Sequence, residues 1–213
     1  MLIELRPEPE VIGWEIVGPE VTGLLALMLL QESRHAARTS PAGELIFLEN
    51  QDRALWNKEQ IAEGVALLEK ALGYREKSGG KSQQKSRPFG SYTLQAAIAA
   101  VHAEAESVAA TDCRQIVALY DRLLKIQPSP VVQLNRAVAI AMRDGPEAGL
   151  AHIDAVLEHG ELANYHLAHS ARADVCRRLG RTAEARASYE KALALTQQEP
   201  ERQFLQERIR QLK

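Results

Sequence analysis

Two pairs of side chains in this sequence have a spacing that suits metal binding. His102 and Glu106 are four residues apart in one predicted helix, and His166 and His169 are three apart in another, so each pair shares a helix face. Such pairs bind zinc when a second helix supplies the remaining ligands. The sequence has no HExxH motif, and neither of its two cysteines has a histidine or cysteine close by. Histidines that pack between helices are the favoured interpretation, and no metal or cofactor is expected.

The sequence also lacks the motifs of nucleophilic and phosphate chemistry. It contains no Gly-x-Ser-x-Gly turn. The segment Gly79-Gly80-Lys81-Ser82 lacks the preceding strand and following helix that a phosphate-binding loop requires. We therefore expect a protein that is not an enzyme, with a histidine-based metalloenzyme as the less favoured alternative.

Charge and cysteine content exclude further classes. The formal net charge is −2, and the basic clusters are not interleaved with aromatic residues, so direct binding of nucleic acid is not expected. Two cysteines are too few for a disulfide scaffold. The most apolar run, residues 24–30, is shorter than the ~20 residues that span a bilayer, and the first 20 residues do not resemble a signal peptide. A cytoplasmic location is expected.

The segment from Gln51 to Trp56 is the most unusual in the chain. Trp56 is expected to bury its ring against a following helix, because apolar residues recur at helical spacing over residues 58–73. Asp52 and Arg53 fit two interpretations, which the sequence leaves open. They form a structural ion pair or cap, or they belong to a polar patch that contacts a partner.

The composition indicates what positions these side chains. The 213 residues include 32 Ala and 27 Leu but only 10 aromatic residues, which predicts closely packed helices. Hydrophobic spacing predicts helices over residues 19–37 and 58–73, with a flexible loop at 76–89. Short breaks rich in Gly, Pro and Asp then separate seven further helices, over residues 92–107, 112–126, 131–143, 146–159, 162–179, 182–196 and 200–212.

These later helices repeat at intervals of 34 to 35 residues. Gly145 and Gly180 are 35 apart, as are Val138 and Ala173, and Tyr120, Asp154 and Tyr189 follow the same period. A helix-turn-helix unit of this length is typical of tetratricopeptide (TPR) repeats. The sequence therefore predicts an all-α fold, a TPR-like stack of helical hairpins closed by the last helix, preceded by an additional helical part.

Longer runs of the sequence resemble a known family. They resemble the C-terminal extension of one group of extracytoplasmic-function (ECF) RNA polymerase sigma factors, over about residues 19–212. The runs are residues 19–30 (PEVTGLLALMLL), 33–38 (SRHAAR), 43–45 (GEL), 51–56 (QDRALW), 61–64 (IAEG), 92–100 (YTLQAAIAA), 128–139 (PSPVVQLNRAVA), 172–174 (RAD) and 178–181 (RLGR).

The resemblance implies a TPR-like regulatory or assembly module of a bacterial sigma factor, without the regions that read the promoter. The implied partners are proteins, namely the sigma core regions or RNA polymerase, with DNA approached only indirectly and no membrane contact. A stand-alone TPR scaffold that binds a peptide or protein is the alternative. The implied organisation is an unmatched segment 1–18, a helical part 19–75, a loop 76–89 and a repeat region 90–213.

Candidate contact residues come from two sources. In a TPR-like hairpin the first helix lines the concave side, and stepping along those helices selects positions on residues 131–143 and 166–178. The matched runs before residue 57 provide the others. The hypothesised partner-binding residues are Arg34, Arg38, Gln51, Asp52, Arg53, Asn135, Arg143, Asp174 and Arg177.

Overall fold

The part of the chain that the structure describes is helical and contains no strand. This computed structural model describes residues 14–41, 43, 45–77 and 89–212. The all-α class expected from composition and periodicity is confirmed. The α-helices are α1 (Trp14–Glu32), α2 (Lys58–Lys77), α3 (Ser91–Glu104), α4 (Cys113–Ile126), α5 (Pro130–Asp144), α6 (Pro146–Glu158), α7 (His166–Arg178), α8 (Thr182–Leu195) and α9 (Glu199–Gln211), and the short 3₁₀ helices are η1 (His35–Ala37), η2 (Leu48–Asn50) and η3 (Arg53–Leu55).

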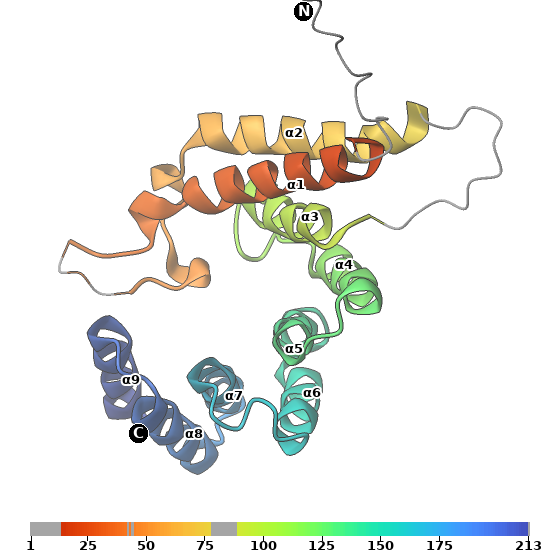
Figure 1. The fold of residues 1–213 in the computed structure, drawn as a ribbon. Coiled ribbons are helices and arrows are strands. Elements are labelled where there is room, and N and C mark those ends of the chain that lie inside the picture. Colours follow the sequence, from red (N-terminus) through yellow and green to blue (C-terminus); the bar gives the residue numbers. More distant parts are fainter. Residues whose placement is uncertain (1–13, 42, 44, 78–88, 213) are drawn as a thin grey trace, which may run out of the picture.

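Helices α3 to α8 form three successive hairpins that curve into an arc. Figure 1 looks nearly along the helices and shows α3, α5 and α7 on the inside of the arc, with α4, α6 and α8 on the outside. Each hairpin shares a hydrophobic cluster with the next. One cluster joins α3, α4 and α5, another joins α5 to α8, and a third joins α7, α8 and α9. Such neighbour-to-neighbour packing defines a helical solenoid.

The turns between paired helices depend on glycines. Gly145 ends α5 and precedes α6 with φ of 100°, and Gly180 follows α7 with φ of 71°. These left-handed conformations are strained for residues that carry a Cβ. The regular spacing of the two glycines therefore has a direct conformational reason.

Small residues allow the helices of the stack to cross closely, and a buried aromatic residue fills the space in the last hairpin. A Cβ added at Gly149 of α6 would lie 2.2 Å from the Cβ of Ala141 on α5, so only glycine permits this crossing. In the last hairpin Ala173 and Ala192 are fully buried around Tyr189, whose side chain is 1% exposed. This arrangement of small, aromatic and small residues is the one that the repeat predicts.

The first three helices form a bundle of their own. Ala26 and Leu30 of α1 pack with Trp56 and Leu68 in one buried cluster, which also takes Ala96, Ala100 and Ala103 from α3. α1 and α3 cross closely, because a Cβ at Gly23 would approach the Thr93 side chain to 2.5 Å. α3 thus belongs both to this bundle and to the first hairpin, so the core continues across the boundary expected near residues 76–89.

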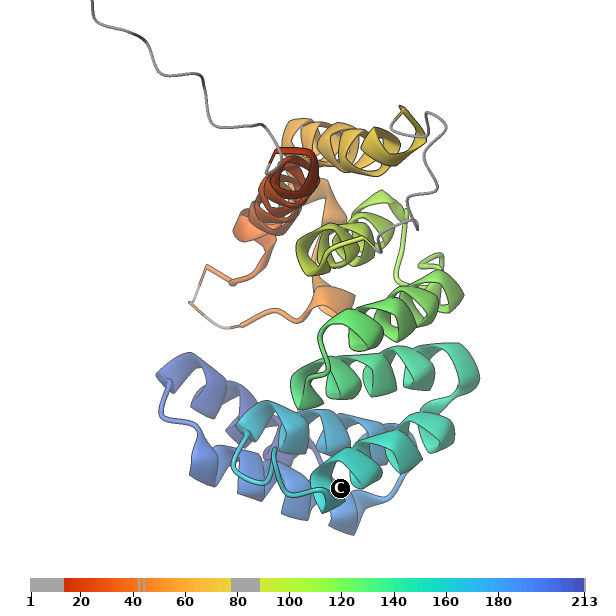
Figure 2. The same cartoon turned by 45° about the vertical axis from the view of Figure 1, so that its right-hand side comes forward.

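The segment before η2 and the last helix, α9, touch each other and so close the arc at its two ends. Phe47, between η1 and η2, meets Phe204 of α9 edge to face, with ring centroids 4.3 Å apart and planes at 72°. Arg208 lies over the Phe204 ring with its guanidinium carbon 5.0 Å from the centroid. Figure 2 shows the segment that carries Phe47 reaching down from the bundle toward the C-terminal helices.

The boundaries of α1, α2 and α7 differ most from those expected, and α3 ends at Glu104 instead of residue 107. α1 begins at Trp14 instead of residue 19, because Pro19 lies inside the helix and removes one amide without breaking it. It ends at Glu32 instead of residue 37. α2 continues to Lys77, into the expected loop, while residues 78–88 and the N-terminal residues 1–13 lie outside the described part of the chain. α7 begins only at His166, since the preceding segment turns at Gly160 with φ of 85°.

Candidate partner-binding surfaces

Both ends of α3 are capped by residues from distant parts of the chain. At its N-terminus the Glu20 carboxylate accepts hydrogen bonds from the amides of Tyr92 and Thr93 at 3.0 and 3.2 Å. At its C-terminus Arg53 Nη1 donates to the carbonyls of His102 and Ala105, both at 2.7 Å. An anion at the start and a cation at the end of a helix both complement its dipole. Of the two interpretations left open for Arg53, the structural cap is the one observed.

Two guanidinium groups lie close to the Trp56 ring. Its side chain is buried, with 2% of its surface exposed. The guanidinium carbon of Arg53 lies 4.5 Å from the ring centroid and that of Arg34 lies 5.8 Å from it. Both distances are in the range of cation–π contacts. Trp56 is therefore buried as expected, and its ring is not available for stacking with an outside ligand.

Arg34, Arg38 and Arg53 form an arginine cluster at the junction of α1, η1 and η3. Arg34 Nη2 donates to Gln31 Oε1 at 2.6 Å, and Arg38 Nη2 donates to the Gln31 carbonyl at 2.5 Å. Burial lowers the pKa of Arg34 from its ordinary value, and the positive charges of Arg38 and Arg53 lower it further. Arg34 thus lies in the repulsive field of the positive charges of Arg38 and Arg53.

His102, at the end of α3, lies against this cluster. Burial lowers its pKa to about 4, and the charges of Arg34 and Arg53 act in the same direction. The imidazole is therefore neutral near pH 7. A neutral ring adds no further positive charge to the cluster.

Gln51 and Asp52 have local structural roles. Gln51 Nε2 donates to the Ile46 carbonyl at 3.1 Å, and Asp52 Oδ1 accepts from the Ala54 amide at 2.9 Å at the start of η3. Both side chains fold back on their own segment. Among the hypothesised residues before position 57, Arg34 and Arg38 are the best placed to meet a partner.

The inner face of the arc carries the second set of hypothesised residues. Asn135 is exposed on α5, near Val131 and Met142, whose side chains are both 37% exposed. On α7 the exposed Leu167 precedes Asp174 and Arg177, which pair at 2.6 Å. This pair raises the pKa of Arg177. The inner face thus combines apolar side chains with polar groups.

Arg143 is less well placed than the sequence suggested. Its Nε and Nη2 atoms donate hydrogen bonds to Oδ1 and Oδ2 of the adjacent Asp144 at 2.8 and 2.6 Å. It follows Asn135 by eight residues, which at ~100° per residue puts it about 80° away around the helix. The structure therefore distributes the nine hypothesised residues over two surfaces and does not gather them into one site.

Sequence reasoning missed one polar network of the stack. Arg172 of α7 donates to Asp154 Oδ1 at 2.7 Å, to Ser188 Oγ at 2.8 Å and to Glu184 Oε2 at 3.2 Å, which ties α6, α7 and α8 together. Asp154 stands where the repeat elsewhere has tyrosine. The change from tyrosine to aspartate was the feature of the sequence that could have revealed the network, because a carboxylate at a packing position needs a cationic or hydrogen-bonding partner.

The histidine pairs do not assemble a metal site. α3 ends at Glu104, so Glu106 is not on the same helix face as His102. His166 Nε2 lies 3.0 Å from Glu201 Oε2, and His169 Nε2 lies 2.9 Å from the Ala163 carbonyl. Within the described residues no group of three or more His, Cys, Asp or Glu side chains could hold a metal ion.

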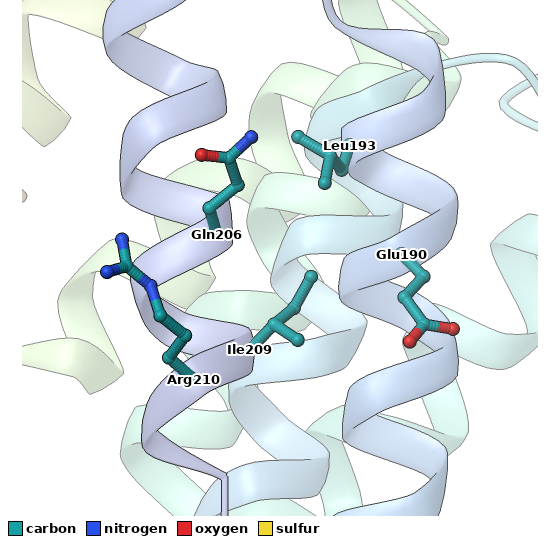
Figure 3. Close-up of a pocket in the computed structure, with 5 residues that line it drawn as sticks. All are labelled: Glu190, Leu193, Gln206, Ile209 and Arg210. Atoms are coloured by element: carbon teal, nitrogen blue, oxygen red, sulfur yellow. The ribbon is translucent and has the colours of Figure 1, made fainter.

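A hollow between α8 and α9 is shallow and open. Figure 3 shows Leu193 and Ile209 projecting between the two helices, with Glu190, Gln206 and Arg210 around them. Its lining contains none of the hypothesised contact residues. No helix in the described residues combines the length and apolar character needed to cross a bilayer.

Comparison with known proteins supports the fold and the interaction role. Residues 15–72 match a family of unknown function (DUF6596), and residues 166–198, which are α7, α8 and their flanks, match the tetratricopeptide repeat. An uncharacterized protein of Rhizobium meliloti (strain 1021) is 45% identical over 177 residues, which cover 83% of this chain and 38% of that protein. The chain thus spans less than half the length of this relative. No solved structure matches.

The fold class can now be stated more closely. The chain is an all-α, TPR-like stack of helical hairpins. A tetratricopeptide repeat indicates a role in protein interaction and a protein as the partner.

Proposed function

We propose that this chain is the interaction module of a bacterial ECF-type RNA polymerase sigma factor, acting in transcription initiation in the cytoplasm. Its partners are the sigma core regions or RNA polymerase, and DNA is reached only through other parts of the assembly. The proposal gives the chain no catalytic role. The matched sequence runs over about residues 19–212 support the transcription assignment.

The observation that carries the interaction role is the exposed inner face of the arc. The hairpins bury hydrophobic clusters that they share with their neighbours, yet Val131, Met142 and Leu167 remain between 37% and 42% exposed on the inner helices α5 and α7. Concave faces of helical solenoids are the surfaces on which these proteins bind extended segments of their partners. The net charge of −2 favours a protein ligand over a nucleic acid there.

A binding experiment with matched variants tests this proposal. Immobilised chain is incubated with purified sigma core regions and, separately, with RNA polymerase. Asn135→Ala and Met142→Ala alter the inner face, while Arg122→Ala alters an exposed position on the outer helix α4. We expect reduced recovery with the two inner-face variants alone. If all three variants recover as much partner as wild type, the inner face does not take part in the interaction. If wild type recovers neither sigma core regions nor RNA polymerase, the assignment to transcription is rejected.

A stand-alone TPR scaffold is the second candidate, favoured by the repeat match at residues 166–198. It shares the inner face but binds a partner outside transcription. The same variants separate the two candidates when they are assayed against both sets of partners. Loss of binding to a non-transcription peptide, with no binding of sigma regions or polymerase, supports the scaffold.

A further inference from the structure

The arginine cluster brings three arginines together, and none of the three forms an ion pair with a carboxylate in the described residues. In the described residues, the hydrogen bonds of Arg34, Arg38 and Arg53 go to Gln31 and to backbone carbonyls. Among the other described arginines some also form no ion pair, such as Arg186 and Arg202, which donate to backbone carbonyls, but six pair directly with a carboxylate. These pairs are Arg136 with Asp121, Arg143 with Asp144, Arg172 with Asp154, Arg177 with Asp174, Arg181 with Glu147, and Arg210 with Glu207.

The acidic residues next to the cluster in the chain are engaged elsewhere. Glu32 Oε1 lies 3.9 Å from His35 Nδ1, and Asp52 accepts from the Ala54 amide at the start of η3. Neither carboxylate lies within ion-pair distance of the three guanidinium groups. Their mutual repulsion, which lowers the pKa of Arg34, is therefore not offset by a neighbouring carboxylate.

The cluster also keeps hydrogen-bonding capacity. A guanidinium group carries five N–H donors. Arg34 uses Nη2 for Gln31, and Arg53 uses Nη1 for the two α3 carbonyls. Arg34 and Arg38 are half-buried, so their remaining donors lie at the surface. Paired N–H groups of this kind bind a carboxylate in a bidentate manner.

An apolar side chain borders the cluster. Leu55, at the end of η3 between Arg53 and Trp56, is 54% exposed. We propose that the arginine cluster binds an acidic peptide segment of a protein partner, with a carboxylate on Arg34 and Arg38 and an adjacent apolar side chain against Leu55. This inference rests on the proposed function only in taking the ligand to be a protein.

The geometry favours a peptide over a nucleic acid. Single-stranded nucleic acids stack their bases on exposed aromatic rings. The ring within the cluster, Trp56, is 2% exposed and is covered by Arg34 and Arg53. Three arginines in a chain of net charge −2 also neutralise few phosphates.

Fluorescence anisotropy with defined probes tests the proposal. The probes are a labelled peptide of Glu, Asp and Leu, the same peptide with Gln and Asn in place of the acids, and a labelled single-stranded oligonucleotide. The variants are Arg34→Ala with Arg38→Ala, and the matched control Arg122→Ala with Arg178→Ala, two exposed arginines on α4 and α7. We expect the acidic peptide alone to bind. The cluster variant should weaken its binding about tenfold or more, and the control should leave it unchanged.

Folding of the cluster variant is checked by circular dichroism and thermal unfolding. If it unfolds, Arg34→Lys with Arg38→Lys takes its place, because lysine keeps the charge but loses the bidentate geometry, and binding should then fall severalfold. Equal binding of the acidic and neutral peptides, or unchanged binding by the cluster variants, overturns the proposal. So does binding of the oligonucleotide through Arg34 and Arg38 more tightly than the peptide.

The outcome can be distinguished from that of the proposed function. Loss of the peptide site with retained recovery of sigma regions or polymerase rejects only the arginine site. An intact peptide site with no recovery of those partners rejects only the transcription assignment.

Discussion

His102 is a histidine placed where protonation is costly. Its ring is half-buried at the end of α3, beside the positive charges of Arg34 and Arg53. The sequence showed this residue as one half of a possible ligand pair with Glu106. It could not show the two arginines, because Arg53 and Arg34 lie 49 and 68 residues earlier in the chain.

The lowered pKa predicts how stability depends on pH. The pKa of His102 is about 4 in the folded chain, against 6.5 for an ordinary histidine. Between these values the unfolded chain binds a proton that the folded chain does not, so the free energy of unfolding falls as the pH drops through this range. The loss amounts to up to about 3 kcal/mol by pH 4 and is absent above about pH 7.

Urea unfolding between pH 7 and pH 4 checks this prediction, with His102→Gln and the matched variant His152→Gln, which replaces an exposed histidine on α6. The glutamine at position 102 should flatten the pH dependence, whereas the one at position 152 should not. NMR titration of His102 should give a midpoint near 4. A midpoint near the ordinary value of 6.5 would contradict the placement of the ring against the arginines.

At the scale of elements, α3 is the helix on which the two parts of the fold meet. Glu20 caps its start and Arg53 caps its end, so both flanking segments are fastened to it. The helix itself was predicted from the sequence, with an end three residues too late. Its caps were not predicted, because both come from distant parts of the chain. Gly90 at the N-cap position has no side chain, and Glu20, which caps the start instead, is 72 residues away from Tyr92. Arg53, which caps the end, comes from η3.

Removing either cap should destabilise the chain. Arg53→Ala loses two hydrogen bonds from a charged donor and a contact with Trp56, which we expect to lower the free energy of unfolding by about 2 kcal/mol. Glu20→Ala should cost about 1 kcal/mol, as for other N-caps. The caps lie at opposite ends of a helix about 20 Å long, so the two losses should add in the double variant.

Chemical denaturation measures these losses. Glu63→Ala on α2 and Arg122→Ala on α4 replace exposed residues and are the matched controls, expected to change stability by less than about 0.5 kcal/mol. A change that small in Arg53→Ala would show that its bonds to the α3 carbonyls are not formed in solution.

At the scale of the whole molecule, the sequence predicted the repeating part of the fold better than its closure. Repeated hairpins give the sequence a regular period, since the glycine turns and the small residues at helix crossings recur in each unit. Gly145, Gly180 and Ala173 were recognised in this way. The contact between Phe47 and Phe204 produces no such period, because it joins two residues that are 157 positions apart and do not belong to the repeat. The candidate contact residues on α5 and α7 were selected from the repeat and those before residue 57 from the family resemblance, and neither source indicates that the structure places them on two separate surfaces.

The aromatic contact predicts that one side chain controls how far the arc is closed. An edge-to-face pair contributes about 0.5–1.5 kcal/mol, which is small compared with the buried clusters that hold each hairpin. Phe47→Ala should therefore separate the ends of the arc while leaving overall stability within about 1 kcal/mol of wild type. Phe47 suits this test better than Phe204, since it is 39% exposed whereas Phe204 packs against the cluster beneath α9.

Distances between spin labels measure the separation. Labels are attached at Glu49→Cys and Gln203→Cys, two exposed positions that flank the contact, after Cys113 and Cys176 have been replaced. Wild type should give a narrow distribution, and Phe47→Ala a broader one at longer distance. Tyr92→Ala, which removes an aromatic side chain that is 44% exposed on α3, is the matched control and should keep the narrow distribution. An unchanged distribution in Phe47→Ala would mean that the curvature of the hairpins alone brings the two ends together, because each hairpin would then hold its angle to the next without the contact.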